Sequence, residues 1–268
     1  MASSLNYLHH NIDDFNNCSI GNDETKLRVL QWNVRGINDL NKFDSVSQYM
    51  EMFKCSVDVI VMGETWLTRA NCSLYKISGY NSLFSCRSQS NGGLAMFVKD
   101  NLSHRVIKNV SLDGYHHIHV EINIKGLFYD VHGIYRPPSY DFADFYQKIE
   151  NIFSSTDCNH SCLIAGDVNV PMNNACNNVV LRYSTLLESY GFVCSNNHVT
   201  RPSSANILDH FICKLDDISY LRNDTIQNDI SDHSIVISSL NLPSKKYCLA
   251  NNKKSSIIVN FKQSFKVF

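Results

Sequence analysis

The chain has 268 residues, of which 44% are hydrophobic and 18% charged, and its formal net charge is −1 at pH 7. This composition fits one large globular domain, and the charge balance excludes a global basic field that would by itself indicate nucleic-acid binding. The longest uncharged apolar runs are strand-sized, well short of the roughly 20 residues that a membrane span requires, so we expect no membrane partner.

The ten cysteines are scattered along the sequence, and no Cys-x-x-Cys pair occurs. A zinc site built on such pairs is therefore not expected. The start of the chain lacks the basic and apolar regions of a signal peptide. We expect reduced thiols in a cytosolic or nuclear protein.

The first quarter of the chain alternates one helix with two strands. Residues 1–26 are polar without periodicity, which predicts a flexible N-terminal arm. Leu27–Trp32 is predicted as the first strand and Val57–Met62 as a strand covered on both faces. Between them, apolar residues recur at helical spacing from Phe43 to Phe53.

The middle of the chain is rich in strands separated by turn residues. Asp113-Gly114 and Lys125-Gly126 divide three apolar runs, Val106–Leu112, Tyr115–Ile124 and Leu127–Tyr135. Two consecutive hairpins are the simplest prediction.

The second half returns to helices and short strands. Apolar stripes predict a helix over 142–153, capped by Ser139 or Asp141, and another over 180–190 that stops at Gly191. Strand Cys162–Ala165 lies between them. With no linker or repeat visible, we predict one domain over 27–242, a two-sheet sandwich flanked by helices. The lysine-bearing tail, 243–268, is expected to be solvated rather than bound to phosphate.

Five short polar clusters lie beside apolar runs that are predicted strands. A buried carboxylate or carboxamide is costly unless it is paired or bound to a metal, so five such placements indicate one shared site. Hydrolysis of a phosphodiester requires oxygen ligands for a divalent metal, a base for water and donors for phosphate. The clusters are Gln31-Trp32-Asn33, Gly63-Glu64-Thr65, Gly166-Asp167-Val168-Asn169, Leu208-Asp209-His210 and Ser231-Asp232-His233.

The chemistry of these residue types indicates individual roles. Glu64 is a hard oxygen ligand suited to Mg²⁺, and the neutral Asn33 can orient it or bond phosphate. Asp167 and Asn169 would share one face of an extended segment, with Asp167 as general base and Asn169 as the residue that orients water. The alternative for this pair is an Asx turn before Pro171.

A second group supplies an imidazole and donors. Asp209 can fix the tautomer of His233 and raise its pKa, which leaves the other ring nitrogen to donate to phosphate. His210 is the rival, but as a strand neighbour of Asp209 it would point to the opposite face. Tyr135 can donate its phenol to phosphate, or pack in the core, and Arg136 lies beside it for the phosphate backbone.

These motifs, in this order, resemble the exonuclease–endonuclease–phosphatase superfamily over residues 27–240. More narrowly they resemble the apurinic-type endonuclease domain of non-LTR (LINE-like) retrotransposons. The strings that carry the finer resemblance are Asn33-Val-Arg-Gly, Gly63-Glu-Thr-Trp-Leu, Gly92-Gly-Leu-Ala, Tyr135-Arg-Pro-Pro-Ser and Leu208-Asp-His. The resemblance implies an α+β fold, a four-layer α/β/β/α sandwich of two mostly antiparallel sheets flanked by helices.

The resemblance also implies the site residues. It places Mg²⁺, with Mn²⁺ as an alternative, at Glu64 and Asp232. Water would lie at Asp167 and Asn169, and phosphate at Asn33, Tyr135 and His233. Arg35 stands where abasic-site repair enzymes of the superfamily carry an acid, which argues against abasic-site repair. Thr200 matches a residue that contacts DNA in the retrotransposon group, or it is a strand-start hydroxyl.

The function most in keeping with these motifs is a DNA endonuclease that nicks target DNA, with a nuclear location inferred from the substrate alone. By resemblance, the 3′ hydroxyl would prime a reverse transcriptase, and no polymerase segment follows in this sequence. We therefore expect an isolated domain, a fragment or a truncated element copy. The alternatives are a phosphoesterase acting on phosphoinositide, sphingomyelin or poly(A), and a catalytically silent nucleic-acid-binding relic.

A group of histidines, His116, His117 and His119, stands apart from these motifs. His117 and His119 would share one strand face. Without an acid or a third ligand nearby in the sequence, we predict a partly exposed strand here rather than a metal site.

Overall fold

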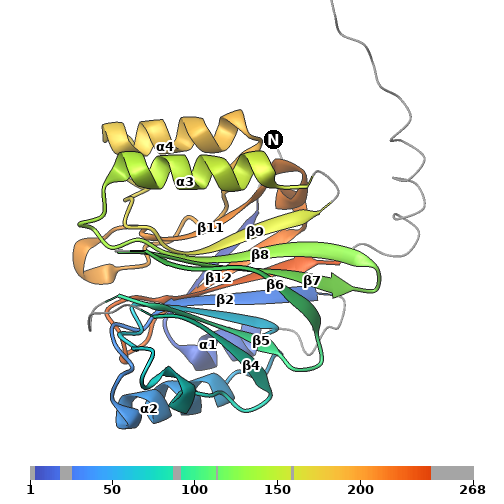
Figure 1. Cartoon of the computed structure of the whole chain (residues 1–268), viewed down its shortest axis with the longest axis vertical. Helices are drawn as coiled ribbons and strands as arrows, with labels where there is room; N and C mark the ends of the chain where they lie inside the picture. Colours follow the sequence, from blue (N-terminus) through green and yellow to red (C-terminus); the bar gives the residue numbers. More distant parts are fainter. Residues whose placement is uncertain (1–3, 19–25, 87–91, 113, 158–159, 243–268) are drawn as a thin grey trace, which may run out of the picture.

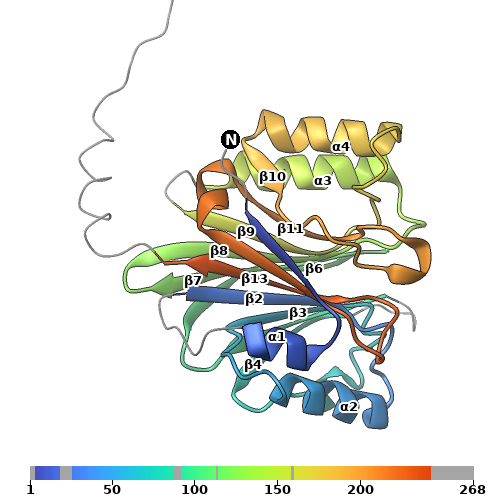
Figure 2. The same ribbon diagram turned by 180° about the vertical axis from the view of Figure 1, so that it is seen from behind.

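Two β-sheets pack face to face in the computed structural model, and helices cover both outer faces (Figure 1). The structure describes residues 4–18, 26–86, 92–112, 114–157 and 160–242. One outer face carries α3 (Phe142–Ser155) and α4 (Asn178–Ser189), and the other carries α1 (Ile12–Cys18) and α2 (Leu40–Glu51), as Figure 2 shows from behind. The expected four-layer α/β/β/α sandwich is confirmed.

The first sheet has seven strands and the second has six. The order in the first sheet is β1 (Leu5–His9), β12 (Leu221–Ile226), β13 (Ile235–Asn241), β2 (Lys26–Asn33), β3 (Val59–Gly63), β5 (Leu94–Lys99), β4 (Tyr80–Ser85). The order in the second sheet is β10 (Phe192–Cys194), β11 (Asp209–Lys214), β9 (Ser161–Asp167), β8 (Leu127–Tyr135), β7 (Tyr115–Ile124), β6 (Ser103–Leu112). Short 3₁₀ turns cover Cys72–Leu74, Pro202–Ser204 and Leu215–Tyr220.

Most neighbouring strands are antiparallel, as expected from the resemblance. The parallel pairs are β1–β12, β2–β3 and β8–β9. The two predicted hairpins are confirmed as β6–β7 and β7–β8. No helix among the described residues is long and apolar enough to cross a membrane.

The predicted helices begin and end where their capping residues stand. The side chain of Asp141, one of the two predicted caps, accepts hydrogen bonds from the backbone N–H of Ala143 and Asp144 at the start of α3. At the other end of the helical layer, Gly191 follows α4 with φ +72°, a left-handed conformation that a residue with a Cβ adopts only at a cost.

The core forms three layers because strand side chains alternate between faces. Leu27 and Val29 of β2 lie between the sheets, whereas Leu30 and Trp32 pack under the helices of the first sheet. The same alternation on β9 sends Leu163 and Ala165 inward between the sheets. Continued to the strand ends, it directs Gln31, Asn33 and Asp167 to the same inner face as the central core.

The prediction of a flexible N-terminal arm over residues 1–26 is wrong for 4–18. β1 pairs in parallel with β12, and His9 lies 2.8 Å from Asp224, both of them buried. Phe15 of α1 packs edge-on against His9 and Phe53. The predicted lysine-bearing tail, 243–268, lies outside the described residues.

Candidate active site

The polar clusters meet at one edge of the sandwich because the strand registers place their ends abreast. In the second sheet, Asp167 pairs with Tyr135 on one side and with Asp209 on the other. In the first sheet, Asn33 pairs with Gly63, the residue before Glu64. The ends of both sheets therefore deliver polar side chains to the same edge.

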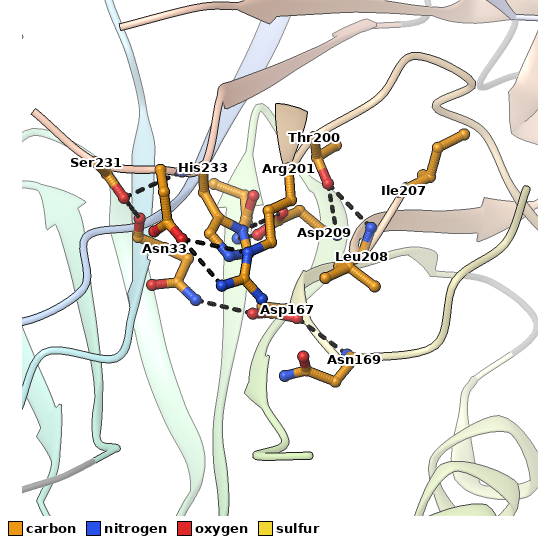
Figure 3. A network of polar contacts seen from close by, with 12 residues as sticks. Asn33, Asp167, Asn169, Thr200, Arg201, Ile207, Leu208, Asp209, Ser231 and His233 are labelled. Carbon is orange, nitrogen blue, oxygen red and sulfur yellow. Dashed lines mark hydrogen bonds and ion pairs between the residues drawn. The ribbon is translucent and has the colours of Figure 1, made fainter. Parts of the chain in front are cut away.

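Four hydrogen bonds cross from one sheet to the other at this edge, and Figure 3 shows the part around Asp167 and Asp209. Each joins a residue from β2, β3 or β13, or from the loop beside it, to one from β8, β9 or β11. The pairs are Asn33 Nδ2 to Asp167 Oδ2 at 2.8 Å, Gln31 Nε2 to Asp209 Oδ1 at 2.7 Å, His233 Nδ1 to Asp209 Oδ2 at 2.7 Å and Tyr135 OH to Glu64 Oε1 at 3.0 Å. The sequence prediction that the five clusters converge is thereby met.

The loops that carry these residues are held in unusual backbone conformations. Glu64 has φ 51° and Asn169 φ 52°, left-handed values that cost about 1–2 kcal/mol for a residue with a Cβ. Ser231 fixes the loop before β13, which carries His233. Its hydroxyl donates to the carbonyl of Asn33 at 2.6 Å and accepts from the N–H of His233 at 3.2 Å. The surrounding hydrogen bonds offset this strain and keep the loops in place.

The position before Asp167, Gly166, has no room for a side chain. A Cβ at this position would lie 1.7 Å from the carbonyl oxygen of Ile134 on the neighbouring strand β8. Any side chain would push β8 and β9 apart, and Asp167 would lose its place opposite Tyr135.

Asp167 and Asn169 come together, but the premise of an extended segment is wrong. The left-handed Asn169 turns the chain, so that its backbone N–H donates to Asp167 Oδ1 at 2.9 Å, the Asx-turn alternative. The Asn169 side-chain amide donates to the carbonyl of Arg136 at 2.8 Å. Its Oδ1 is the atom left to accept a hydrogen bond from water.

The expected dyad of Asp209 and His233 is present and buried, with the two side chains 0% and 4% exposed. Burial lowers the pKa of His233, but the charge of Asp209 and its hydrogen bond outweigh burial and raise the pKa to about 9. The ring is therefore an imidazolium at pH 7, with Nδ1 bonded to Asp209 and Nε2 as a second donor.

The pKa of Asp167 is also raised, which for a carboxyl group favours the neutral form. Burial and the charge of Asp209 raise its pKa to about 8, although His233, Asn33 and the Asn169 N–H act to lower it. A carboxyl with this pKa can take a proton near neutral pH, as a general base must.

Glu64 and Asp232 form a more open group on the other side of the edge. Both are half-buried, and the charges of both act on Lys42, whose ammonium donates to the carbonyls of Val34 and Arg35. Asp232 Oδ2 lies 3.0 Å from Arg35 Nη1 and 3.0 Å from Arg201 Nη2. Burial alone would raise the pKa of Asp232, but His233 and these two arginines lower it, so it is a carboxylate at pH 7.

The donor set of this group fits a divalent cation. Asp232 Oδ1 is buried and has no hydrogen-bond partner among the residues that the structure describes. An unpaired buried carboxylate oxygen is costly, and a hard cation such as Mg²⁺ would satisfy it together with Glu64. Asp167, Asp209 and His233 also bring ligand atoms within 4.8 Å of one another, but hydrogen bonds already engage these atoms.

The structure does not place Arg136 or Thr200 where direct substrate contact was expected. The Arg136 guanidinium is turned inward to the carbonyls of Val168 at 3.0 Å and Tyr140 at 2.7 Å. Thr200 is 0% exposed, and its hydroxyl accepts the backbone N–H groups of Leu208 and Asp209 (Figure 3). Both residues hold the loops that carry Asp167 and Asp209. Thr200 lies in the loop between β10 and β11, and its hydroxyl caps the start of β11 from there.

His210 points away from the site, as strand alternation predicts. Its Nε2 lies 2.8 Å from the carbonyl of Val170, and burial lowers the pKa of the ring to about 4. A neutral His210 that faces α4 leaves His233 as the imidazole of the site.

Sequence reasoning missed three supporting residues of the site and gave no role to a fourth, Gln31. Gln31 holds Asp209 from the opposite sheet, and Arg201 pairs with Asp232. Asn196 donates to the carbonyl of Asp209 at 2.8 Å, and Asn228 donates to that of His233 at 2.9 Å. Gln31 stood in a recognised cluster. No local signal marks Asn196, whose partner Asp209 lies on β11, or Asn228, whose bond to His233 depends on how the loop before β13 folds.

The chain belongs to the Endonuclease/Exonuclease/phosphatase family, whose sequence pattern matches residues 30–233. Its fold is similar to that of the endonuclease domain of TRAS1, a telomere-specific non-LTR retrotransposon, with a TM-score of 0.64 and 13% identity over 82% of this chain and 100% of that one. AP endonuclease LMAP from Leishmania major gives a TM-score of 0.63 and 13% identity over 82% and 89% of the two chains. D. rerio TDP2 in complex with single-strand DNA product gives 0.60 and 13% over 81% and 100%. No curated protein matches the chain in sequence.

Proposed function

We propose that this protein is a metal-dependent DNA endonuclease that hydrolyses a phosphodiester bond and nicks one strand. The observation that carries the proposal is the set of four hydrogen bonds between the sheets. They gather a carboxyl of raised pKa, an imidazolium and two further carboxylates at one edge. Each of these groups answers a requirement of phosphodiester hydrolysis.

Asp167 takes the proton from the attacking water in this mechanism. Asn33 donates to one of its oxygens and the N–H of Asn169 to the other, so the carboxyl is held in a fixed orientation. The Oδ1 of Asn169 accepts a hydrogen bond from the same water. The water oxygen adds to phosphorus, the bond to the 3′ oxygen breaks, and the leaving oxygen takes a proton from solvent to become a 3′ hydroxyl.

His233 stabilises the charge that develops on the phosphate. Its Nδ1 is engaged by Asp209, so Nε2–H donates to a non-bridging phosphate oxygen while the ring stays an imidazolium. Tyr135 donates to Glu64 and positions that carboxylate. Donation of the phenol to phosphate would require this hydrogen bond to exchange.

Glu64 and Asp232 would hold Mg²⁺, or Mn²⁺ in its place. When bound, the cation neutralises charge on the phosphate and on the leaving oxygen. The Oδ1 of Asp232, which has no hydrogen-bond partner in the described ranges, supports this assignment.

DNA is favoured as the substrate by charge at the site. Arg35, with 56% of its side chain exposed, and Arg201, with 35%, line the same edge as Asp232 and would contact the strand on either side of the scissile phosphate. The similar structures include an endonuclease domain, an AP endonuclease and a complex with a DNA product. By the retrotransposon resemblance, the nick would prime a reverse transcriptase, and the protein would act in the nucleus.

A substrate panel tests this proposal. The purified chain is given Mg²⁺ and, in parallel, a supercoiled plasmid, poly(A) and a phosphoinositide. We expect nicked circular plasmid with 3′ hydroxyl ends and little product from the other two substrates. If poly(A) or phosphoinositide is hydrolysed faster than plasmid, DNA is not the substrate, although the same catalytic groups would still act.

A further inference from the structure

A second cluster of metal-ligand side chains lies on the outer face of the second sheet, toward the end opposite the active site. Strand alternation turns His119 and Glu121 of β7 away from the central core, which takes Ile118, Val120 and Ile122. Asp130 of β8 pairs directly with Glu121. Asp130 precedes Tyr135 by five residues of extended strand, so the cluster stands roughly 17 Å from the catalytic edge.

The cluster is drawn together by hydrogen bonds to one carboxylate. His119 Nε2 lies 2.8 Å from Asp130 Oδ1, and His160 Nδ1 lies 2.9 Å from Asp130 Oδ2. Ligand atoms of Glu121, Asp130 and His160 all lie within 4.8 Å of one another. The sequence prediction placed no metal site at His117 and His119 because it found no acid or third ligand nearby. In the structure an acid comes from β8 and a third ligand from the residue before β9, so that premise is wrong.

The chemistry of this donor set matches a transition-metal dication. Imidazole nitrogens with carboxylate oxygens are ligands that Zn²⁺ prefers, at about 2.0–2.2 Å, which places ligand atoms about 3.4 Å apart in a tetrahedral site. Asp130 and His160 already lie closer than this, and Glu121 has to move by roughly an ångström. Glu121 is otherwise paired with Arg105, whose side chain is 70% exposed, and such a pair costs little to break.

Two carboxylates in the cluster favour a cation. Asp130 is hydrogen-bonded to His119 and to His160, and Glu121 pairs with Asp130 across β7 and β8.

Two neighbouring histidines, His117 and His132, hold the ligand His119 in place. His132 stacks on His119 with ring centroids 3.9 Å apart, and its Nδ1 lies 2.9 Å from His117 Nε2. His117 Nδ1 is buried without a hydrogen-bond partner within the described part of the chain. This row fixes the ring plane of His119 beside Asp130, as neighbours of a metal-ligating histidine commonly do.

We propose that Glu121, Asp130 and His160, with His119 beside them, form a binding site for a transition-metal dication such as Zn²⁺, separate from the catalytic edge. Coordination replaces the hydrogen bonds to Asp130, so the ligating nitrogens of His119 and His160 give up their protons to solvent or to the other ring nitrogen. Glu121 leaves Arg105 and neutralises the cation together with Asp130. The proposal does not depend on the nuclease function.

Co²⁺ absorption and calorimetry with Zn²⁺ on the full chain test this site. We expect visible bands of tetrahedral Co²⁺ that Zn²⁺ abolishes, in the native protein and equally in Glu64→Gln, which alters only the catalytic edge. Glu121→Gln and His160→Gln should weaken Zn²⁺ binding at least about 10-fold. His104→Gln, a histidine of the adjacent strand β6 outside the cluster, is the matched control and should bind as the native protein does.

Several outcomes overturn the proposal. Undiminished Zn²⁺ binding in Glu121→Gln and His160→Gln would place the metal elsewhere, as would a sulfur-to-cobalt charge-transfer band, which indicates cysteine ligands. If the native protein shows no Co²⁺ bands, the cluster binds no such metal and is only a carboxylate hydrogen-bonded to two histidines. Far-ultraviolet circular dichroism of each variant separates lost binding from lost folding, and the half-buried Glu121 is replaced by a side chain of the same size in Glu121→Gln.

Discussion

The candidate active site has a buried half, with Asp167 and Asp209, and an open half, with Glu64 and Asp232. The two halves differ in how many of their carboxylate oxygens are already hydrogen-bonded. Asp167 and Asp209 are 1% and 0% exposed, and each accepts a hydrogen bond on both oxygens. Glu64 and Asp232 are half-buried, and Asp232 keeps one buried oxygen without a partner among the described residues.

The difference indicates a division of labour. A buried carboxyl with both oxygens hydrogen-bonded is held in one orientation, which suits proton transfer and charge stabilisation. A carboxylate with an unused oxygen and exchangeable arginine partners suits a cation and a polyanion that come and go. The predictions below change one half at a time.

The largest effect is expected in the buried half. Asp167→Asn keeps the size of the side chain but removes the base, so single-turnover nicking of a DNA duplex should fall about 10³-fold. The Mg²⁺ concentration for half-maximal rate should stay unchanged. Asp144→Asn, an exposed position on α3, is the matched control. A fully active Asp167→Asn protein would remove Asp167 from the mechanism.

The open half should respond through its metal. Glu64→Gln removes one hard ligand, so the Mg²⁺ concentration for half-maximal nicking should rise about 10- to 100-fold, with partial recovery of rate at saturating Mg²⁺. A Mg²⁺ titration of the nicking rate measures this. An unchanged Mg²⁺ midpoint with a lower maximal rate would mean that Glu64 acts in the chemical step and not as a metal ligand.

The pH profile gives a finer test of Asp167. Its raised pKa of about 8 means that the basic form is the minor one at pH 7, so kcat/KM should rise through pH 8 and fall again as His233 deprotonates near pH 9. Asn33 donates to Asp167 and lowers its pKa, so Asn33→Ala should move the rising limb to higher pH. The rate at pH 7 should drop about 10-fold. A rising limb that does not move would separate Asn33 from the proton transfer.

The smallest effect is expected at the exposed arginine. Arg35→Ala frees Asp232 from one of two ion pairs, so we expect a few-fold lower Mg²⁺ requirement and a few-fold higher KM for DNA. Removal of one phosphate contact should reduce the slope of log binding constant against log salt concentration by about 1. Arg105→Ala, an exposed arginine far from this edge, should change neither quantity. A native salt slope in Arg35→Ala would exclude the phosphate contact.

Local patterns predicted the strand ends of the site well, because a polar residue that ends a buried strand is conspicuous in sequence. The Asp209–His233 dyad and the outward His210 followed from residue chemistry and strand alternation. Arg136 and Thr200 were expected at the substrate, but each is buried and bonded to backbone. Strand alternation does not give the direction of these two side chains, because hydrogen bonds to the backbone of neighbouring loops set it.

Long-range pairing explains the other differences. β1 is an exposed edge strand without an apolar alternation, and its order comes from parallel pairing with β12. At the second cluster, Asp130 bonds both His119 and His160, and the three residues come from different elements whose register sets the contacts. Asp167 and Asn169 were expected on one extended face, yet the left-handed Asn169 turns the chain between them.

The central claim is that this edge hydrolyses DNA phosphodiester bonds with a divalent metal and Asp167. The most direct measurement is nicking of a supercoiled plasmid by the purified chain with Mg²⁺, with EDTA, and with Asp167→Asn in place of the native protein. We expect open circles with 3′ hydroxyl ends in the first reaction and intact plasmid in the other two. Plasmid that stays supercoiled with Mg²⁺, or that is nicked equally in all three reactions, would contradict the account.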